Sequence, residues 1–338
     1  MRSSLQALLN EKQILLADGA TGTNFMEMGL EPGFPPDLWN VSEPHKPEAL
    51  HQMFVDAGSD IILTNTFGAN APRLKLHKAE NQTYEINRAG AEIASRVAEK
   101  AERPVIVAGS VGPTGELFVP LGAMTLTDAR NAFKEQMRGL KDGGADVAWI
   151  ETMSAADEIQ AAAEAAVEVG IAYVFTASFD TAGKTMMGLA PAALAELAHA
   201  LPGKPLAFGA NCGVGASDLL VSVLSMTDAA PEAIIVAKAN CGIPVVKGAT
   251  TVYTGTPDLM ADYIAMAADA GVRIIGGCCG TKPEHVKAMR DALDRYQRAE
   301  RPTIEAIVEK IGKLVAPPAR DDGTAPRRER RGRRRAEA

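Results

Sequence analysis

Short apolar runs alternate with amphipathic stretches eight times along the chain. The apolar runs are nearly continuous, which is typical of parallel strands that are covered on both faces. The stretches between them repeat apolar residues at helical spacing. This alternation predicts the strands Ile14–Ala20, Ile61–Gly68, Val105–Gly112, Val147–Met153, Ala172–Phe179, Ala207–Gly213, Ile234–Gly242 and Arg273–Gly280. It predicts the helices Pro47–Ala57, Asn81–Ala101, Asp128–Asp142, Ala155–Val169, Ala192–Leu201, Asp218–Met226, Pro257–Ala270 and Pro283–Arg298.

Eight such units in a row predict an α/β fold, a single (β/α)8 TIM barrel. An open dinucleotide-binding sheet would instead carry one early Gly-x-Gly-x-x-Gly turn, whereas glycines here follow several of the strands. The apolar pattern of residues 301–315 predicts one more amphipathic helix. We therefore expect one barrel domain over residues 1–315.

Local signals indicate where several helices begin and end. Ser154, Thr256 and Thr281 are expected N-caps, with Pro257 at the first position of its helix. Glu284 is expected at the third position of a capping box that begins at Thr281. Three turns of similar sequence, ending in Gly58, Gly144 and Gly271, are expected to stop a helix in a left-handed conformation.

The C-terminal stretch differs from the rest of the chain. From Ala316 it is rich in Pro and then in Arg, with few apolar residues to bury, so residues 316–338 are predicted to be a disordered basic tail. Such a tail either contacts RNA or an acidic partner, or is an accessory solvated segment. The first 319 residues carry 27 basic and 38 acidic residues, and this acidic body disfavours general binding to nucleic acid.

Four cysteines in 338 residues are too few and too widely spaced for a disulfide scaffold. The chain also lacks an apolar run of 18 residues and an N-terminal apolar segment of the kind found in signal peptides. These features predict a reduced, soluble protein of the cytoplasm.

Three of the cysteines follow predicted strands. Cys278 and Cys279 lie in the stretch Gly276–Gly280, and Cys212 lies in the stretch Gly209–Gly213. The carboxyl ends of barrel strands share one face, where barrel enzymes carry their chemistry. We therefore expect the three thiols to form a metal site, while Cys241 is interpreted as a buried core residue.

Zinc is the natural metal for three thiolates in a reducing compartment. The cysteines come from two strand ends 66 residues apart and lack the short spacing of a structural zinc finger, which favours a catalytic site with one open position. Three anionic sulfurs make zinc a weak activator of water. The same shell would bind a fourth thiol as a thiolate and leave it nucleophilic. The predicted reaction is alkylation of a substrate thiol.

Polar groups after two other strands indicate what the substrate carries. Asp18 begins the stretch Asp18–Thr23, whose backbone amides could hold a carboxylate, and Glu151 ends a buried strand, where it could pair with an ammonium. The alternatives are an Asx turn for Asp18 and a helix cap for Glu151. An anion cradle, a carboxylate and a thiophilic metal together predict an amino acid that bears a thiol.

The sequence resembles the zinc-dependent homocysteine S-methyltransferases, which include betaine–homocysteine methyltransferase, S-methylmethionine-dependent enzymes and the homocysteine module of cobalamin-dependent methionine synthase. The resemblance covers roughly residues 12–297. The matching stretches are Asp18–Thr23, Thr64–Gly68, Gly109–Pro113, Glu151–Thr152, Gly209–Cys212 and Gly276–Gly280.

The resemblance implies a TIM barrel in which Cys212, Cys278 and Cys279 hold Zn2+ and the zinc binds the sulfur of homocysteine. It also implies that homocysteine is methylated to methionine. The amino and carboxylate groups of the substrate would then be held by Asp18, Gly19, Ala20, Thr21 and Glu151. Asn240 matches an asparagine that some members place near the metal, where it would occupy the open position without substrate.

The resemblance leaves the methyl donor open between a small molecule, such as betaine or S-methylmethionine, and a separate corrinoid protein, as in a split cobalamin-dependent methionine synthase. A quaternary ammonium donor needs aromatic walls. The stretch after the second strand is Phe67-Gly68-Ala69-Asn70 and carries no Tyr, although Trp39 is available and Phe67 lies nearby.

Overall fold

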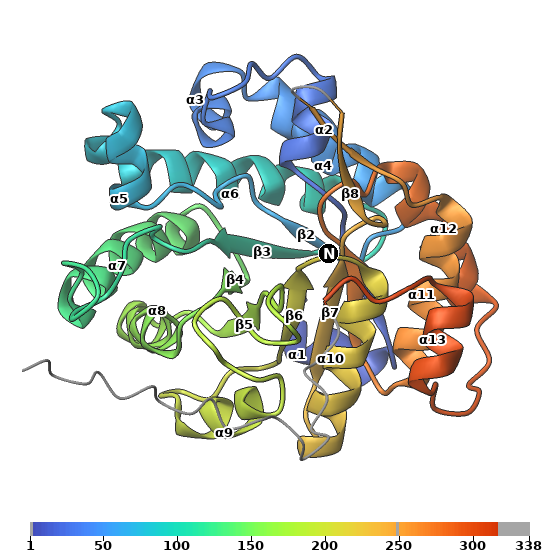
Figure 1. Ribbon diagram of the computed structural model, residues 1–338. Coiled ribbons are helices and arrows are strands. Elements are labelled where there is room, and N and C mark those ends of the chain that lie inside the picture. The colour runs from blue at the N-terminus through green and yellow to red at the C-terminus, as the bar shows by residue number, and fades with distance from the viewer. Residues whose placement is uncertain (1–2, 248–249, 317–338) are drawn as a thin grey trace, which may run out of the picture.

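A computed structural model describes residues 3–247 and 250–316. Its centre is a parallel sheet of eight strands with helices around the outside (Figure 1). The strands of this sheet are β1 (Leu15–Leu16), β2 (Ile61–Leu63), β3 (Ile106–Val111), β4 (Val147–Met153), β5 (Tyr173–Ala177), β6 (Phe208–Cys212), β7 (Ile235–Ala239) and β10 (Ile274–Gly277).

The helices include the predicted ones, in the predicted order, and additional short helices that the sequence pattern did not predict. They are α1 (Leu5–Glu11), α2 (Gly22–Glu27), α3 (Trp39–Ser42), α4 (His45–Asp56), α5 (Ala71–Leu74), α6 (Thr83–Lys100), α7 (Leu126–Asp142), α8 (Ala156–Val169), α9 (Ala193–Ala200), α10 (Ala216–Ala229), α11 (Pro257–Asp269), α12 (Pro283–Asp294) and α13 (Ile304–Lys310). Three short 3-10 helices are η1 (Pro36–Leu38), η2 (Lys75–His77) and η3 (Glu80–Gln82).

The sheet closes on itself through its first two strands. Its neighbours follow the order β1-β10-β7-β6-β5-β4-β3-β2, and a parallel bridge between Ala17 and Ile61 joins the two ends. At this seam the amide of Asp18 donates a hydrogen bond to the carbonyl of Ile61 at 3.0 Å. The predicted (β/α)8 barrel is confirmed. The predicted tail from residue 316 falls almost wholly on residues 317–338, which lie outside the described residues.

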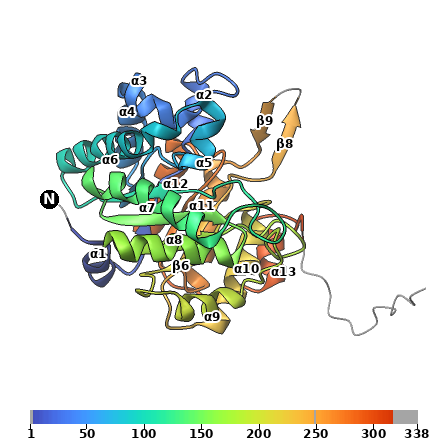
Figure 2. The same ribbon diagram turned by 90° about the vertical axis from the view of Figure 1, so that its left-hand side faces the viewer.

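A helix that the sequence pattern did not predict packs beneath the barrel. Helix α1 begins after Ser4, whose hydroxyl accepts a hydrogen bond from the amide of Ala7. Its buried leucines Leu5, Leu8 and Leu9 share one apolar cluster with inward-facing strand residues such as Trp149. Each leucine contributes roughly 1.5–3 kcal/mol by this burial. Figure 2 shows α1 at the end of the barrel opposite the hairpin described next.

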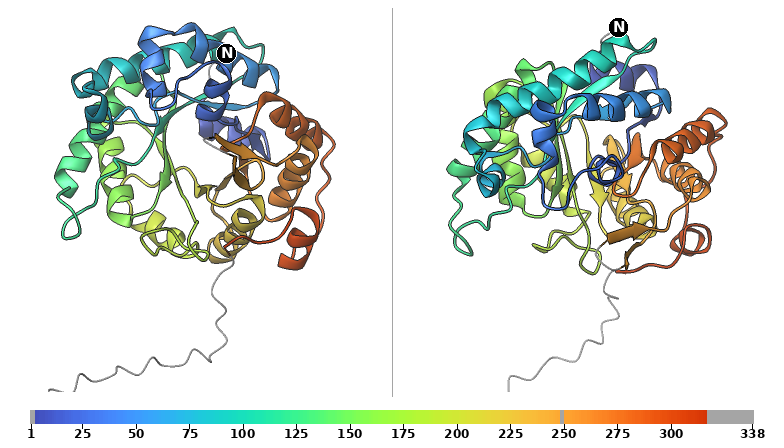
Figure 3. Two further views of the ribbon diagram at one scale, coloured as in Figure 1. Left: turned by 45° about the horizontal axis from the view of Figure 1, so that its top comes forward. Right: turned by 90° about the horizontal axis from the view of Figure 1, so that it is seen from above.

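A two-stranded antiparallel hairpin also escaped the sequence pattern. It consists of β8 (Pro244–Lys247) and β9 (Thr250–Tyr253) and is inserted between β7 and α11. The hairpin projects from the barrel at its carboxyl end, away from α1 (Figures 2 and 3). Its base is fixed by a hydrogen bond from the amide of Gly255 to the carbonyl of Cys241 at 2.9 Å.

Two of the three expected N-caps are wrong. Helix α8 has Ala155 as its N-cap rather than Ser154. Helix α12 has Lys282 as its N-cap rather than Thr281, so Glu284 falls at the second helical position. His285, not Glu284, reaches back to accept a hydrogen bond from the amide of Lys282 at 3.0 Å. The carbonyl of Thr281 instead accepts from the amide of Ala20, which ties this turn to the end of β1.

Other local predictions are confirmed. The hydroxyl of Thr256 caps α11, and Pro257 is its first residue. Gly58, Gly144 and Gly271 have φ angles of +106°, +94° and +94°, as expected of turns that leave a helix for the next strand. Within residues 3–247 and 250–316, no helix combines the length and the apolar character that crossing a membrane requires.

Candidate active site

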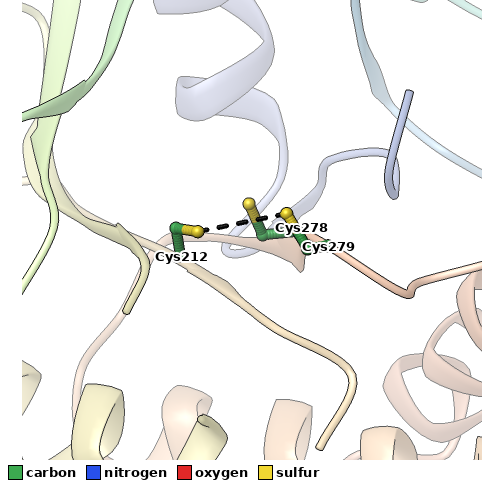
Figure 4. A group of neighbouring side chains, drawn as sticks. All are labelled: Cys212, Cys278 and Cys279. Atoms are coloured by element: carbon green, nitrogen blue, oxygen red, sulfur yellow. Dashed lines mark hydrogen bonds between the residues drawn. The ribbon is translucent and has the colours of Figure 1, made fainter. Parts of the chain in front are cut away.

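Three thiols meet at the carboxyl end of the barrel. Cys212 ends β6, and Cys278 and Cys279 follow β10 directly. Their Sγ atoms all lie within 4.8 Å of one another, and those of Cys212 and Cys279 are 4.0 Å apart (Figure 4). Cys212 has a φ angle of +62°, an uncommon conformation for a residue with a side chain. The backbone therefore adopts this uncommon conformation at the residue whose thiol faces those of Cys278 and Cys279.

The spacing of the thiols fits a single metal ion. Zinc bound to tetrahedral thiolates at about 2.3 Å would place neighbouring sulfurs about 3.8 Å apart. Crowding opposes ionisation of the thiols in the absence of a cation. The neighbouring Cys278 thiol raises the pKa of Cys212 to about 12, and the neighbouring Cys212 thiol raises the pKa of Cys279 to about 11. Cys241 is buried in the core outside this group, as predicted.

Asn211, which directly precedes Cys212 in β6, supports the thiol group. Its side-chain nitrogen donates to the hydroxyl of Thr152 at 2.7 Å and to the Sγ of Cys278 at 3.8 Å. Its side-chain oxygen accepts from the amide of Thr152 and from the hydroxyl of Thr176. Asn211 thus connects β4, β5 and β6 to the cysteine turn. Asn211 and Thr152 both lie in stretches that carry the family resemblance, but the sequence pattern predicted no role for either residue.

Asn240 joins the two loops that carry the cysteines. Its side-chain nitrogen donates to the carbonyl of Gly213 at 2.7 Å, and its oxygen accepts from the amide of Cys279 at 3.1 Å. In this arrangement both ends of the amide are engaged by backbone groups next to the thiols. Asn240 therefore lies beside the thiol group and links the two loops, and its predicted role at the open metal position stays a prediction.

Tyr253, at the end of the hairpin, reaches the same thiols. Its hydroxyl lies near the thiol of Cys279 and favours the ionised form of that thiol, which lowers the pKa of Cys279 against the larger upward effect of the neighbouring Cys212 thiol. The ring lies against Gly280, where a Cβ atom would stand only 2.3 Å from the Cγ of Tyr253. Gly280 also has a φ of +79°, so glycine is required here both by the backbone and by the ring above it. Sequence reasoning missed Tyr253 because it missed the hairpin.

Asp18 is deeply buried and already has partners. One of its carboxylate oxygens accepts from the amide of Leu63 at 2.7 Å, and the other lies 2.6 Å from the Nζ of Lys238. Burial raises the pKa of Asp18, and the Lys238 ammonium opposes that shift. Lys238 projects from β7 and was also missed, since a single lysine in an apolar run gives no sign of which way it points.

Glu151 lies in the second half of β4, next to this pair. The hydroxyl of Ser110 donates to Glu151 Oε1 at 2.5 Å. Burial raises the pKa of Glu151, while the charge of Lys238 and the Ser110 hydrogen bond lower it. The helix-cap alternative for Glu151 does not apply, because α8 has Ala155 as its N-cap.

The stretch after β1 passes close to the cysteine turn. The amide of Ala20 donates to the carbonyl of Thr281 at 3.0 Å, and Gly19 packs against the same carbonyl with no space for a side chain. The amide of Ala20 is thereby committed to the protein. Within the expected carboxylate cradle, this leaves the amides of Gly19 and Thr21.

The aromatic residues considered for a cation-binding wall have neighbours of their own. Trp39 is buried, its ring centroid lies 5.0 Å from that of Phe25, and the Nζ of Lys46 lies 4.0 Å above it. The guanidinium of Arg73 lies 5.9 Å from the centre of the Phe67 ring. Both rings therefore already have a cation of the protein near them.

A closed barrel with three convergent thiols at its carboxyl end defines a barrel protein whose thiol group could hold a metal ion. The chain belongs to the homocysteine S-methyltransferase family, whose sequence model matches residues 15–293. It is therefore a methyltransferase, and the reaction of this family is methylation of homocysteine.

Individual relatives agree with this family. The chain is 29% identical over 306 residues to methionine synthase of Mycobacterium leprae and 29% identical over 312 residues to that of Mycobacterium tuberculosis. These matches cover 84% and 86% of this chain, which spans about a quarter of the length of either relative. The metallated homocysteine methyltransferase MmuM of Escherichia coli has the same fold, with a TM-score of 0.71 and 24% identity over 85% of this chain and 99% of that one.

Proposed function

We propose that the protein methylates the sulfur of homocysteine to form methionine at a zinc ion held by Cys212, Cys278 and Cys279. The convergence of the three Sγ atoms within 4.8 Å of one another carries this proposal. Three thiolates and one open position suit a metal that binds a substrate thiol. When bound, zinc supplies the Lewis acidity that keeps that thiol deprotonated at neutral pH.

The residues of the chain then orient the thiol. Asn240 joins the two cysteine loops through hydrogen bonds of 2.7 and 3.1 Å to their backbone. Asn211 donates to the Sγ of Cys278 at 3.8 Å and to the hydroxyl of Thr152 at 2.7 Å. Glu151 is the partner for the ammonium of homocysteine, and the amides of Gly19 and Thr21 face its carboxylate. During transfer the S–CH3 bond forms as the bond from the donor to the methyl group breaks.

The first candidate donor is a small molecule such as betaine or S-methylmethionine. The fold shared with MmuM is compatible with a single-domain enzyme of this kind. A quaternary ammonium requires an open aromatic face. Trp39 and Phe67, the two rings that sequence reasoning considered, are already near Lys46 and Arg73.

The second candidate donor is a methyl group carried by a separate corrinoid protein, and one surface feature favours it. Large apolar side chains are exposed on loops that follow β3, β5 and β7, at the end of the barrel that carries the thiols. They are Leu117, Val119, Leu121, Met186, Met187 and Ile243. Apolar groups around a catalytic mouth suit contact with another protein. Sequence similarity to one quarter of two methionine synthases agrees with a component that works with a partner.

The donor assay tests both candidates. The purified, zinc-loaded chain is incubated with homocysteine and betaine, S-methylmethionine or a methylated corrinoid protein, and methionine is measured. Formation of methionine with the corrinoid protein alone supports the second candidate. Rapid turnover with betaine or S-methylmethionine rejects it. A chain that binds no thiol and forms no methionine with any donor contradicts the proposed function.

We also propose a reducing compartment, the cytoplasm, as the place of action, since the site needs three free thiols. The basic tail is proposed to be accessory to the barrel domain. Deletion of residues 320–338 should leave methyl transfer in vitro unchanged, and loss of transfer would assign the tail a role in the reaction.

A further inference from the structure

A buried ion pair involves Asp18, one of the residues that the family resemblance implies in binding the amino and carboxylate groups of the substrate. The Nζ of Lys238 is 2.6 Å from Asp18 Oδ1, and the two side chains are 3% and 1% exposed. The other oxygen of Asp18 accepts from the amide of Leu63. The protein itself therefore satisfies both oxygens of Asp18.

The partners of Glu151 differ from those of Asp18. It shares the electrostatic environment of Lys238 and Asp18, yet among the residues that the structure describes its carboxylate accepts a hydrogen bond from the neutral hydroxyl of Ser110 alone. Lys238 acts on Glu151 through its charge but forms its ion pair with Asp18, so within the described part of the chain Glu151 has no cation in direct contact. With all three groups ionised, one lysine and two carboxylates leave the site with a net charge of −1, and that charge resides on Glu151.

We propose that Lys238 is a positioning residue that determines the charge of substrate the site accepts. By occupying Asp18, it leaves Glu151 as the partner for one substrate ammonium. The site then fits a thiol that bears a single ammonium, the class to which homocysteine belongs. This inference rests on the proposed function, because it concerns how that same site selects its thiol.

A purely structural role for Lys238 is the competing explanation. Its ammonium lies 5.9 Å from the centre of the Trp149 ring, inside the barrel, and a buried cation is costly unless it is paired. Removal of either partner therefore lowers stability under both explanations. A test must therefore measure which ligand charge the site prefers, in addition to whether the variant is folded.

Two analogues of homocysteine provide this readout. One lacks the carboxylate (3-mercaptopropylamine) and the other lacks the amine (4-mercaptobutanoate). The affinities of the zinc-loaded chain for both are measured by calorimetry at fixed pH and salt, with homocysteine as the reference. The quantity of interest is the ratio of the two affinities, since a general loss of packing weakens both ligands together.

Three variants change the charge of the site in known steps. Lys238→Met makes it more negative by one charge, Asp18→Asn makes it less negative by one, and the double variant restores −1. We expect Lys238→Met to shift the ratio about tenfold or more towards the amine, and Asp18→Asn to shift it similarly towards the acid. The double variant should return towards the wild-type ratio.

The chain offers a matched control at the other end of the barrel. Lys12, whose side chain is 35% exposed, forms an ion pair of the same length, 2.6 Å, with Asp60, which is also 1% exposed. Lys12→Met should lower stability and leave the ratio unchanged. If Lys238→Met does not fold, Asp18→Asn and the double variant still test the direction of the shift.

The outcomes distinguish failure of the role proposed for Lys238 from failure of the proposed function. A ratio that follows the charge steps supports the role of Lys238. A ratio that stays constant in the folded variants, or that changes equally in Lys12→Met, overturns it. Failure of the zinc-loaded wild-type chain to bind homocysteine would instead overturn the proposed function.

Discussion

The ring of Tyr253 packs over Gly280 with its hydroxyl near the thiol of Cys279, so the hairpin β8–β9 contacts the cysteine turn directly. The two residues belong to different βα units. A phenol that donates to a metal-binding sulfur withdraws charge from it and fixes its orientation. The hairpin is therefore part of the support of the thiol group.

Loss of the Tyr253 hydroxyl should weaken metal binding. Tyr253→Phe keeps the ring over Gly280 and removes only the hydroxyl, and we expect zinc affinity to fall roughly tenfold. Competition with a coloured chelator measures it. Tyr84→Phe is the control, since that hydroxyl bonds to Asp142 on the outer surface at 2.9 Å. Equal zinc affinity in Tyr253→Phe and wild type would contradict the role given to the hairpin.

The four cysteines should divide into three that bind metal and one that packs. Cys279→Ala is expected to abolish stoichiometric zinc, because two thiolates do not hold the ion as three do. Cys241→Ala removes a buried thiol outside the group and should retain about one zinc per chain, with a small loss of stability. Metal analysis of both proteins after dialysis gives the answer. Full zinc content in Cys279→Ala would reject the site.

Two glycine variants can separate the effect of steric crowding at Gly280 from the effect of a positive φ angle. Gly280→Ala places a methyl group 2.3 Å from the Cγ of Tyr253, at a φ of +79°. Gly29→Ala has a similar φ of +91° and meets no heavy atom within 4 Å. We expect Gly29→Ala to cost about 1 kcal/mol of unfolding free energy and Gly280→Ala about 3 kcal/mol.

Urea denaturation of the two variants measures this difference. Zinc affinity should fall in Gly280→Ala alone, since only that methyl group displaces Tyr253. Equal losses of stability in both variants, with unchanged zinc affinity, would show that the ring does not constrain the turn.

The stability of the barrel should contain two opposed contributions between pH 4 and pH 6. Burial lowers the pKa of His51 to about 4 from 6.5, so the unfolded chain binds the extra proton and stability is lost as the pH falls through this range. Burial raises the pKa of Asp37 to about 6 from 3.8, so here the folded chain binds the proton and stability is gained as the pH falls from 6. Each contribution amounts to about 3 kcal/mol.

Single variants should expose each contribution. Relative to wild type, Asp37→Asn should lose stability more steeply between pH 6 and pH 4, because the loss from His51 is no longer offset. His51→Leu should show the reverse. Denaturation midpoints at several pH values measure the slopes, and parallel curves for all three proteins would contradict the assignment.

Much of the fold was predictable from local pattern. The eight apolar runs correspond to the eight barrel strands, although the predicted ranges extended beyond the ladders, as for β10, which ends at Gly277. The helices shift by a few residues at their ends. The hairpin escaped because β8 begins with Pro244 and follows β7 closely, so no separate strand pattern was recognised.

The sequence alone determined that Cys212, Cys278 and Cys279 follow strands of one parallel array, because the carboxyl ends of such strands share a face. Only the tertiary structure decided that Lys238 points inward to Asp18 and that Tyr253 reaches Cys279. The residues of the first pair are 220 positions apart, and those of the second come from separate loops. Side-chain direction depends on strand register and barrel closure, in which each residue faces a partner that local sequence does not specify.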